Sequence, residues 1–187
     1  NFLIRMALAL RPQDESGVLL LKPGWLQQRL IDLEIPVVVE PLSRSFNPVW
    51  LYRAFKLVKE QQIDVIHSHE FAMNSHLALV AKAAGVRHVA TVHGRKYYGD
   101  SSARRAVYRM VARLSGLVAV SEDIKSYLVD SVGVAPDRVT VIRNGIAVED
   151  YQQNSDDLAQ IRNYLGCSER DFLICAIGNL YPVKGHF

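Results

Sequence analysis

Residues 63–69 read IDVIHSH, a short apolar run that leads directly into two histidines separated by one serine. Four later runs are built in the same way, with β-branched apolar residues followed at once by small or polar ones. They are HVATV at 88–92 before His93-Gly94, GLVAV at 116–120 before Ser121-Glu122, VTVI at 139–142 before Arg143-Asn144-Gly145, and FLICAI at 172–177 before Gly178-Asn179. Runs of this length and composition are typical of buried strands. The repetition predicts a sheet with polar residues along one edge.

The segments between these runs have the length and periodicity of helices. Strands are expected at 18–22, 36–40, 63–67, 88–92, 117–120, 138–142 and 172–177, and helices near 2–10, 25–33, 48–61, 73–84, 103–115, 122–132 and 157–165. The helices near 73–84 and 122–132 are expected to end at Gly85 and Gly133. Strands that alternate with helices of this length form right-handed crossovers and a parallel sheet. The expected fold class is therefore α/β, a Rossmann-like parallel sheet with helices on both faces. Ligands of such sheets bind outside the carboxyl ends of the strands, which is where the polar clusters fall.

The composition is that of a folded globular protein. The 187 residues are 49% hydrophobic and 22% charged, and the net charge is +3. This charge does not indicate a nucleic-acid partner, and no nucleic-acid motif accompanies it. No apolar run approaches the roughly 18 residues that a membrane-spanning helix needs. Cys167 and Cys175 have neither a zinc-site spacing nor the number for a disulfide framework, so we expect reduced thiols in the cytoplasm.

We expect the chain to be a fragment of a larger protein. Residues 2–10 present a helical apolar face with no capping residue before it, and the last residues resemble the start of another helix. The expected organisation is a Rossmann-like domain at 1–150 without its first strand, a linker and helix at 151–170, and the start of a second α/β domain at 171–187.

Five motifs, in this order and spacing, resemble family-4 glycosyltransferases of the GT-B fold. They are DVIHSHEF at 64–71, TVHG at 91–94, VAVSE at 118–122, VTVIRNGI at 139–146 and IGNLYPVKGH at 177–186. The resemblance implies two Rossmann-like domains that face each other across a cleft, the first holding the acceptor and the second a nucleotide-sugar. It also implies sugar transfer to a glycan, lipid-linked or small-molecule acceptor, with retained anomeric configuration and no obligatory metal or other cofactor.

The donor diphosphate is expected to bind near the end of the chain. Lys184 lies in a glycine-containing turn before a helix start, so its ammonium and the helix amides would both face the phosphates. By resemblance Gly178, Asn179, Lys184 and Gly185 form this site. The family pattern has an arginine where this sequence has Asn179, so one cation is missing. The alternative for Lys184 is a solvated lysine at a helix start.

His93 follows a strand end and precedes Gly94. The resemblance implies that His93 is catalytic, because it would lie beside the reacting sugar and position it or stabilise charge. The alternative from the residue alone is a hydrogen-bonded histidine in a turn. The resemblance assigns the rest of the acceptor-side cleft to Gly94, to His67 and His69, to Ser121, and to Asn144 and Gly145.

His67 and His69 are two residues apart, so on a strand both side chains lie on the same face. Three interpretations are open: they line the acceptor cleft, they are structural, or they are two ligands of a metal. A catalytic zinc site has three protein ligands, and His93 or Glu70 is placed to supply the third. We expect no metal.

Ser121 and Asn144-Gly145 have structural interpretations as well. Ser121 precedes Glu122 and Asp123, which is typical of a helix N-cap followed by acidic residues in the first turn. Asn144-Gly145 is a common turn sequence. By resemblance these positions border the cleft and shape it.

Residues 95–113 concentrate the basic charge, with six Arg or Lys and one Asp. Arg105, Arg109 and Arg113 are spaced four apart and form one stripe on a helix. This stripe fits peripheral contact with an anionic membrane, at its inner face, or a phosphate-bearing acceptor. The alternative is a solvated basic helix face.

Two other functions stay open. A nucleotide-sugar epimerase would share the architecture, and a non-catalytic binding module would explain the lost cation at Asn179. A nicotinamide-binding Rossmann protein is disfavoured because the sequence has no GxGxxG.

Overall fold

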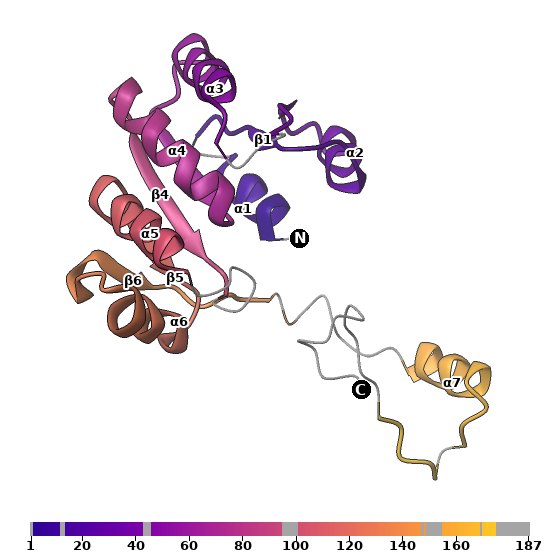
Figure 1. Cartoon of the computed structure of the whole chain (residues 1–187). Coiled ribbons are helices and arrows are strands. Elements are labelled where there is room, and N and C mark those ends of the chain that lie inside the picture. The colour runs from indigo at the N-terminus through magenta and orange to yellow at the C-terminus, as the bar shows by residue number, and fades with distance from the viewer. Residues whose placement is uncertain are drawn as a thin grey trace. The chain divides into compact units, whose positions relative to one another are not determined.

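The computed structural model describes residues 2–11, 14–42, 46–94, 101–146, 148, 155–168 and 170–174. In chain order the elements are α1 (Phe2–Leu10), β1 (Val18–Leu20), α2 (Trp25–Asp32), β2 (Val37–Val39), α3 (Pro48–Glu60), β3 (Val65–His69), α4 (Phe71–Ala84), β4 (Arg87–Val92), α5 (Ser102–Leu114), β5 (Gly116–Ala119), α6 (Glu122–Ser126), the π-helix η2 (Tyr127–Val132), the 3-10 helix η3 (Pro136–Arg138), β6 (Val139–Val141) and α7 (Ser155–Tyr164) (Figure 1). The chain forms two compact units, Asn1–Asn144 and Gly145–Phe187. Helices alternate with strands through the first unit, which confirms the α/β class.

All strand pairs in the described residues are parallel, as predicted. The strands form two sheets, β1-β2 and β3-β4-β5-β6, where the sequence predicted one. The difference arises because β1 pairs only with β2 and β3 only with β4 among the described strands. In the larger sheet His67 lies beside Val89, and His69 lies beside Thr91. This register brings the carboxyl ends of β3 and β4 together.

The small sheet β1-β2 has helices on both of its faces, as predicted. On one face, Ile4 and Ala7 of α1, Leu30 of α2 and Ile35 before β2 pack against Val18, Leu20 and Val37. Leu19 points the opposite way, because strand side chains alternate, and it packs against the cluster that α3 and α4 form. Trp50 lies at the centre of that second cluster and is 1% exposed.

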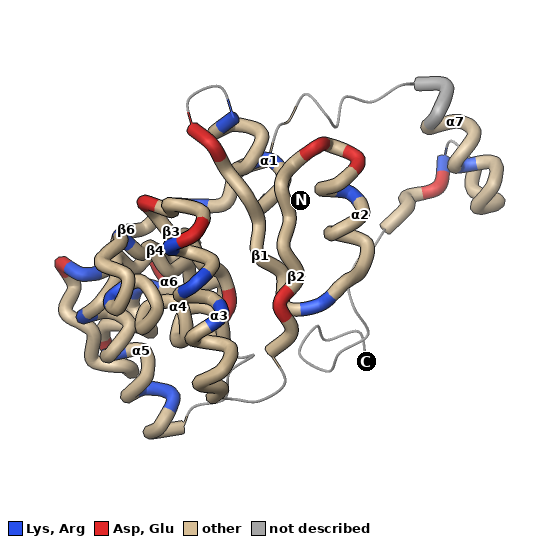
Figure 2. The backbone as a smooth tube through the Cα atoms, turned by 90° about the horizontal axis from the view of Figure 1, so that it is seen from above, with Lys and Arg blue, Asp and Glu red and all other residues tan. Residues whose placement is uncertain are grey.

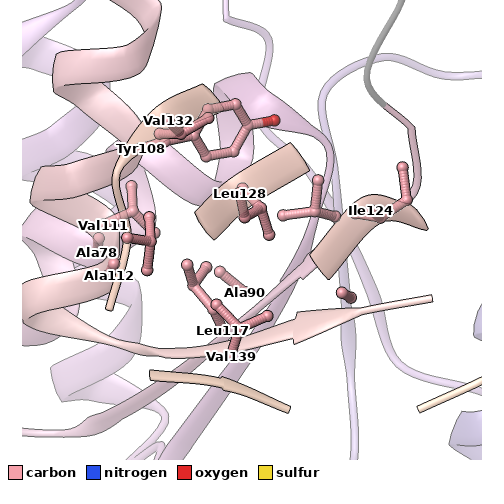
Figure 3. Close-up of a cluster of buried hydrophobic side chains, with 13 residues drawn as sticks. Ala78, Ala90, Tyr108, Val111, Ala112, Leu117, Ile124, Leu128, Val132 and Val139 are labelled. Atoms are coloured by element: carbon pink, nitrogen blue, oxygen red, sulfur yellow. The ribbon is translucent and has the colours of Figure 1, made fainter. Parts of the chain in front are cut away.

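The main core lies between the larger sheet and the helices α4, α5, α6 and η2 (Figure 3). Tyr108, Val111 and Ala112 from α5 meet Leu128 and Val132 from η2, over Ala90, Leu117 and Val139 of the strands. The ring of Phe71 also packs edge-on against Tyr108, with centroids 5.1 Å apart. This core covers one face of β4–β6, and Ile66 of β3 packs into the second cluster with α4. Because strand side chains alternate, His67 and His69 lie on the other face of β3.

Helix ends follow the sequence signals. Asn47 caps α3 by accepting from the Trp50 amide at 3.1 Å, with Pro48 in the first turn. Gly85 and Gly133, predicted to end helices, have φ of 75° and 81°, a left-handed conformation that glycine adopts without strain. Both helix-end predictions are confirmed.

Three boundaries differ from the prediction. β3 continues through His69, two residues past the expected end. The helix expected at 122–132 becomes a π-helix from Tyr127 onward, where the Gly133 amide reaches the carbonyls of both Leu128 and Val129. Residues 172–174 are not in a strand, and the rest of the strand predicted at 172–177 lies outside the described residues.

Candidate functional site

Three imidazoles gather at the carboxyl ends of β3 and β4. His67 and His69 belong to β3, and His93 follows β4 directly. The ring centroids of His67 and His69 are 4.4 Å apart, and those of His69 and His93 are 5.2 Å apart. The structure thus brings together three residues that the sequence assigned to the site, and the prediction that His67 and His69 share a face is confirmed.

Two hydrogen bonds order the imidazoles. His69 Nδ1 lies 2.9 Å from His93 Nε2, and His67 Nε2 lies 2.8 Å from Thr91 Oγ1. A contact between two ring nitrogens requires one N–H and one lone pair, so the two tautomers are linked. The imidazole pair His69–His93 therefore holds its rings, and the proton between them, in a defined arrangement.

Burial lowers the pKa of each of these imidazoles and so favours the neutral form. It lowers the pKa of His69 from 6.5 to about 4, with added repulsion from His67 and His93. The pKa of His67 is lowered by burial and by His93. The pKa of His93 is lowered by burial, while the nearby carboxylate of Glu70 acts to raise it. Neutral imidazoles present both a donor and an acceptor near pH 7, which suits the binding of hydroxyl groups.

Glu70 has an unusual backbone between β3 and α4. Its φ of 71° and ψ of 151° lie in a region that residues other than glycine rarely adopt. Glu70 occupies the N-cap position of α4, yet its side chain makes no capping hydrogen bond there. From the sequence, Glu70 is a candidate only as a third metal ligand, whereas in the structure its carboxylate acts electrostatically on His93.

Sequence reasoning missed Thr91 and Asn74. From the sequence, Thr91 belongs to a buried strand, yet in the structure its hydroxyl orients His67. Asn74 is 1% exposed in the first turn of α4, and its Nδ2 donates to the Thr91 carbonyl at 3.0 Å. An asparagine at a buried helix position was the available signal, because a polar group buried there needs partners.

The other predicted cleft residues do not join the imidazoles by any hydrogen bond in the described part. Gly94 follows His93 and is half-buried, and a Cβ placed on it would meet nothing within 4 Å. Ser121 caps α6 by accepting from the Ile124 amide at 3.3 Å, which is its structural interpretation. Asn144 and Gly145 are exposed and lie at the junction of the two compact units.

The predicted diphosphate residues Gly178, Asn179, Lys184 and Gly185 lie outside the described residues, as do Cys175 and residues 95–100 of the basic segment. Within the described ranges, no three His, Cys, Asp or Glu side chains are grouped so that they could hold a metal ion. His67 and His69 thus lack a third ligand of that kind in this part of the structure.

Figure 2 marks the Lys and Arg positions of the described chain in blue. On α5, one residue of the basic stripe is used for packing. Arg109 Nη1 donates to the Val132 carbonyl at 2.9 Å and so ties α5 to the end of η2. Arg105 is half-buried, whereas Arg113 is exposed. Arg104 lies over the Phe71 ring at 5.5 Å. None of the described helices is both long and apolar enough to span a bilayer.

Proteins whose sequences are similar to this chain are glycosyltransferases. The sequence profile of Glycosyltransferase Family 4 matches residues 2–150. The UDP-Gal:alpha-D-GlcNAc-diphosphoundecaprenol alpha-1,3-galactosyltransferase of Escherichia coli is 26% identical over 181 residues, which cover 91% of this chain and 45% of the relative.

Solved structures show the same fold. A glycosyltransferase from Rickettsia africae superposes with a TM-score of 0.77 at 19% identity, over 89% of this chain and 45% of the other. The Anabaena protein HepE, solved in complex with UDP and glucose, gives a TM-score of 0.73 at 19% identity, over 88% and 46% of the two chains. The chain spans just under half the length of the proteins it matches.

Proposed function

This chain belongs to glycosyltransferase family 4, and from that membership we propose that the protein containing it transfers a sugar from a nucleoside-diphosphate sugar to an acceptor hydroxyl. The family match over residues 2–150 supports the transfer reaction. The similarity to a galactosyltransferase whose name includes a UDP-sugar donor supports the donor class. In the reaction the acceptor oxygen bonds to the anomeric carbon, and the nucleoside diphosphate leaves with the electron pair of its C–O bond. The proton of the acceptor hydroxyl passes to the leaving diphosphate or to water.

The imidazole pair His69–His93 carries this proposal. It lies at the carboxyl ends of β3 and β4, where parallel sheets bind ligands, and burial lowers the pKa of both rings. A neutral His93 can donate to a sugar hydroxyl through one nitrogen while the other is held by His69. An imidazole fixed in this way needs no reorientation as charge develops on the sugar. Retention of the anomeric configuration is part of the proposal and follows from the family resemblance.

The leaving diphosphate is assigned to Gly178, Asn179, Lys184 and Gly185, as the sequence predicts. Lys184 would supply the cation, and Asn179 a neutral donor where the family pattern has an arginine. Phosphate oxygens favour such a combination of ammonium and backbone amides.

For the acceptor we propose a lipid-linked glycan. The galactosyltransferase from Escherichia coli acts, by its name, on a sugar linked to diphosphoundecaprenol. The basic stripe of Arg105, Arg109 and Arg113 would hold the protein at an anionic inner membrane face while such an acceptor is used. The reaction would then belong to polysaccharide biosynthesis in the cytoplasm.

The test is transfer from a panel of nucleotide-sugars by the intact protein, with and without lipid-linked acceptors. We expect product only with an acceptor, and a fall in turnover of at least about 100-fold in His93→Ala. Lys82→Ala, at an exposed position in the last turn of α4, is the control and should match the parent. Sugar conversion without an acceptor would instead identify an epimerase, and no donor binding would identify a binding module.

A further inference from the structure

A continuous series of buried hydrogen bonds runs beneath the imidazoles, on the helix-covered face of the sheet. Its members are Ser115, His88, Ser68, Asn74 and the Thr91 carbonyl. Ser115 Oγ lies 2.6 Å from His88 Nδ1, and His88 Nε2 lies 2.7 Å from Ser68 Oγ. Ser68 donates to Asn74 Oδ1 at 2.6 Å, and Asn74 Nδ2 donates to the Thr91 carbonyl at 3.0 Å. Each of these side chains is at most 9% exposed.

The donors and acceptors give this series one direction. The Thr91 carbonyl can only accept, so Asn74 presents its NH₂ to it and its oxygen to Ser68. Ser68 has one hydroxyl proton, which goes to Asn74, so His88 must donate to Ser68 from Nε2. Burial lowers the pKa of His88 to about 4, so the ring is neutral near pH 7 and has a single N–H. His88 Nδ1 therefore accepts from the Ser115 hydroxyl.

Asn74 is the point at which this series reaches the site. It belongs to α4, and it binds the side chain of Ser68 on β3 and the main chain of Thr91 on β4. Ser68 lies between His67 and His69, and Thr91 lies two residues before His93. On the opposite face of the sheet the Thr91 hydroxyl holds His67 at 2.8 Å. A single amide thus joins the two strand ends from which all three imidazoles project.

We propose that Asn74 is a positioning residue, which fixes the distance between the ends of β3 and β4 and so holds the imidazole pair His69–His93 in contact. The catalytic consequence rests on the proposed transferase function, whereas the structural consequence does not. Misplacing a catalytic group by about 1 Å costs up to roughly 100-fold in rate. Loss of the Asn74 amide should therefore reduce turnover although Asn74 itself touches no substrate.

The test compares Asn74→Leu with the parent in the intact protein. NMR of ¹⁵N-histidine-labelled protein measures the imidazole nitrogens, and steady-state kinetics measures kcat and KM. Without the Asn74 oxygen, the Ser68 hydroxyl turns to His88 Nε2, and we expect His88 to change from the Nε2–H to the Nδ1–H tautomer. We also expect altered His69 and His93 signals and a kcat about 10- to 100-fold lower, with KM changed far less. Ser75→Ala removes the neighbouring hydroxyl on α4, which lies outside the series, and should leave kcat and the His88, His69 and His93 signals as in the parent. The His76 signal should change, because the Ser75 hydroxyl contacts that ring.

Asn74→Asp provides a second test of the proposal if Asn74→Leu does not fold. A protonated aspartate can accept from Ser68 and donate to Thr91, whereas the ionised form can only accept. Burial raises the pKa of such a carboxyl, so turnover relative to the parent at the same pH should recover as the pH falls.

The proposal would be overturned if the His69 and His93 signals were unchanged in both variants. It would also be overturned if Asn74→Leu changed the His88 tautomer but kept the kcat of the parent. The imidazole signals can be read in a protein that transfers no sugar. If the proposed function is wrong, the parent will transfer no sugar, but its imidazole signals will still change when Asn74 is replaced. The two failures can therefore be distinguished.

Discussion

His69 Nδ1 and His93 Nε2 lie 2.9 Å apart, so the two rings share one proton between them. Double protonation would bring two N–H groups together and break the contact. The pair is therefore a unit that functions while it is neutral, and its response to acid can be predicted.

Activity should persist below the pH at which an ordinary histidine gains a proton. Burial lowers the pKa of His93, and that of His69 from 6.5 to about 4. The neutral rings are therefore lost only as pH falls through these lowered values. We expect kcat/KM to stay level down through pH 6.5 and to decline on the acid side of it. A pH profile of kcat/KM checks this, and a decline centred at or above pH 6.5 would contradict it.

Glu70 acts in two ways, through the charge of its carboxylate and through its strained backbone, and two substitutions separate these effects. Because its carboxylate raises the pKa of His93, Glu70→Gln should move the acid decline of kcat/KM to lower pH. Glu70→Gly should move it equally and also relieve the strain at φ 71°, raising the free energy of unfolding by about 1 kcal/mol. pH profiles and chemical unfolding of both variants give the comparison. Equal stability of the two variants would show that the backbone is unstrained.

Stability should decrease in mild acid because of His88, which is 4% exposed. The unfolded chain binds a proton near pH 6.5, whereas the folded ring binds it only near pH 4. The unfolded state thus holds more protons between these values, and the free energy of unfolding falls by about 3 kcal/mol as pH drops from 6.5 to 4. Below pH 4 this contribution is constant. Chemical unfolding across this range should show a flatter dependence in His88→Gln, and an identical slope would refute the assignment.

Arg109 and Arg113 carry equal charge but differ in their contacts. Arg109→Ala leaves the Val132 carbonyl without its donor and should cost about 1 kcal/mol of stability. Arg113→Ala, at an exposed position, should leave stability unchanged. If the stripe binds membranes, both variants should weaken binding to anionic phosphatidylglycerol vesicles at low salt to a similar degree. Sedimentation with vesicles measures this, and a parent that ignores the vesicles would exclude the membrane role.

Much of the fold could be predicted because it depends on local pattern. The apolar runs placed the strands of β3 to β6, and Gly85 and Gly133 marked two helix ends. The shared face of His67 and His69 follows from their spacing alone. The pairing of His69 with His93 is different, because it depends on the register of two strands and joins residues that are 24 positions apart in the sequence.

Other features have no local signal. The backbone of Glu70 is strained, and nothing in the residue type predicts a positive φ there. Thr91 and Asn74 acquire roles only when β4 and α4 are brought together. The π-helix after Ser126 ends at Gly133, whose amide reaches the carbonyls of Leu128 and Val129, and no residue pattern in 127–132 predicts it.

The division of the strands into two sheets has a further consequence, for the order in which the molecule opens. β4 is paired along both edges and lies over the main core, so its amide protons should exchange with solvent only when the whole unit Asn1–Asn144 unfolds. The pair β1-β2 has three residue pairs and a core of four buried side chains, so it should open in smaller, more frequent fluctuations. His93 would then directly follow the slowest-exchanging strand, and His67 and His69 would lie on β3, which pairs with that strand. Partial loss of β1-β2 would therefore leave the imidazoles in place.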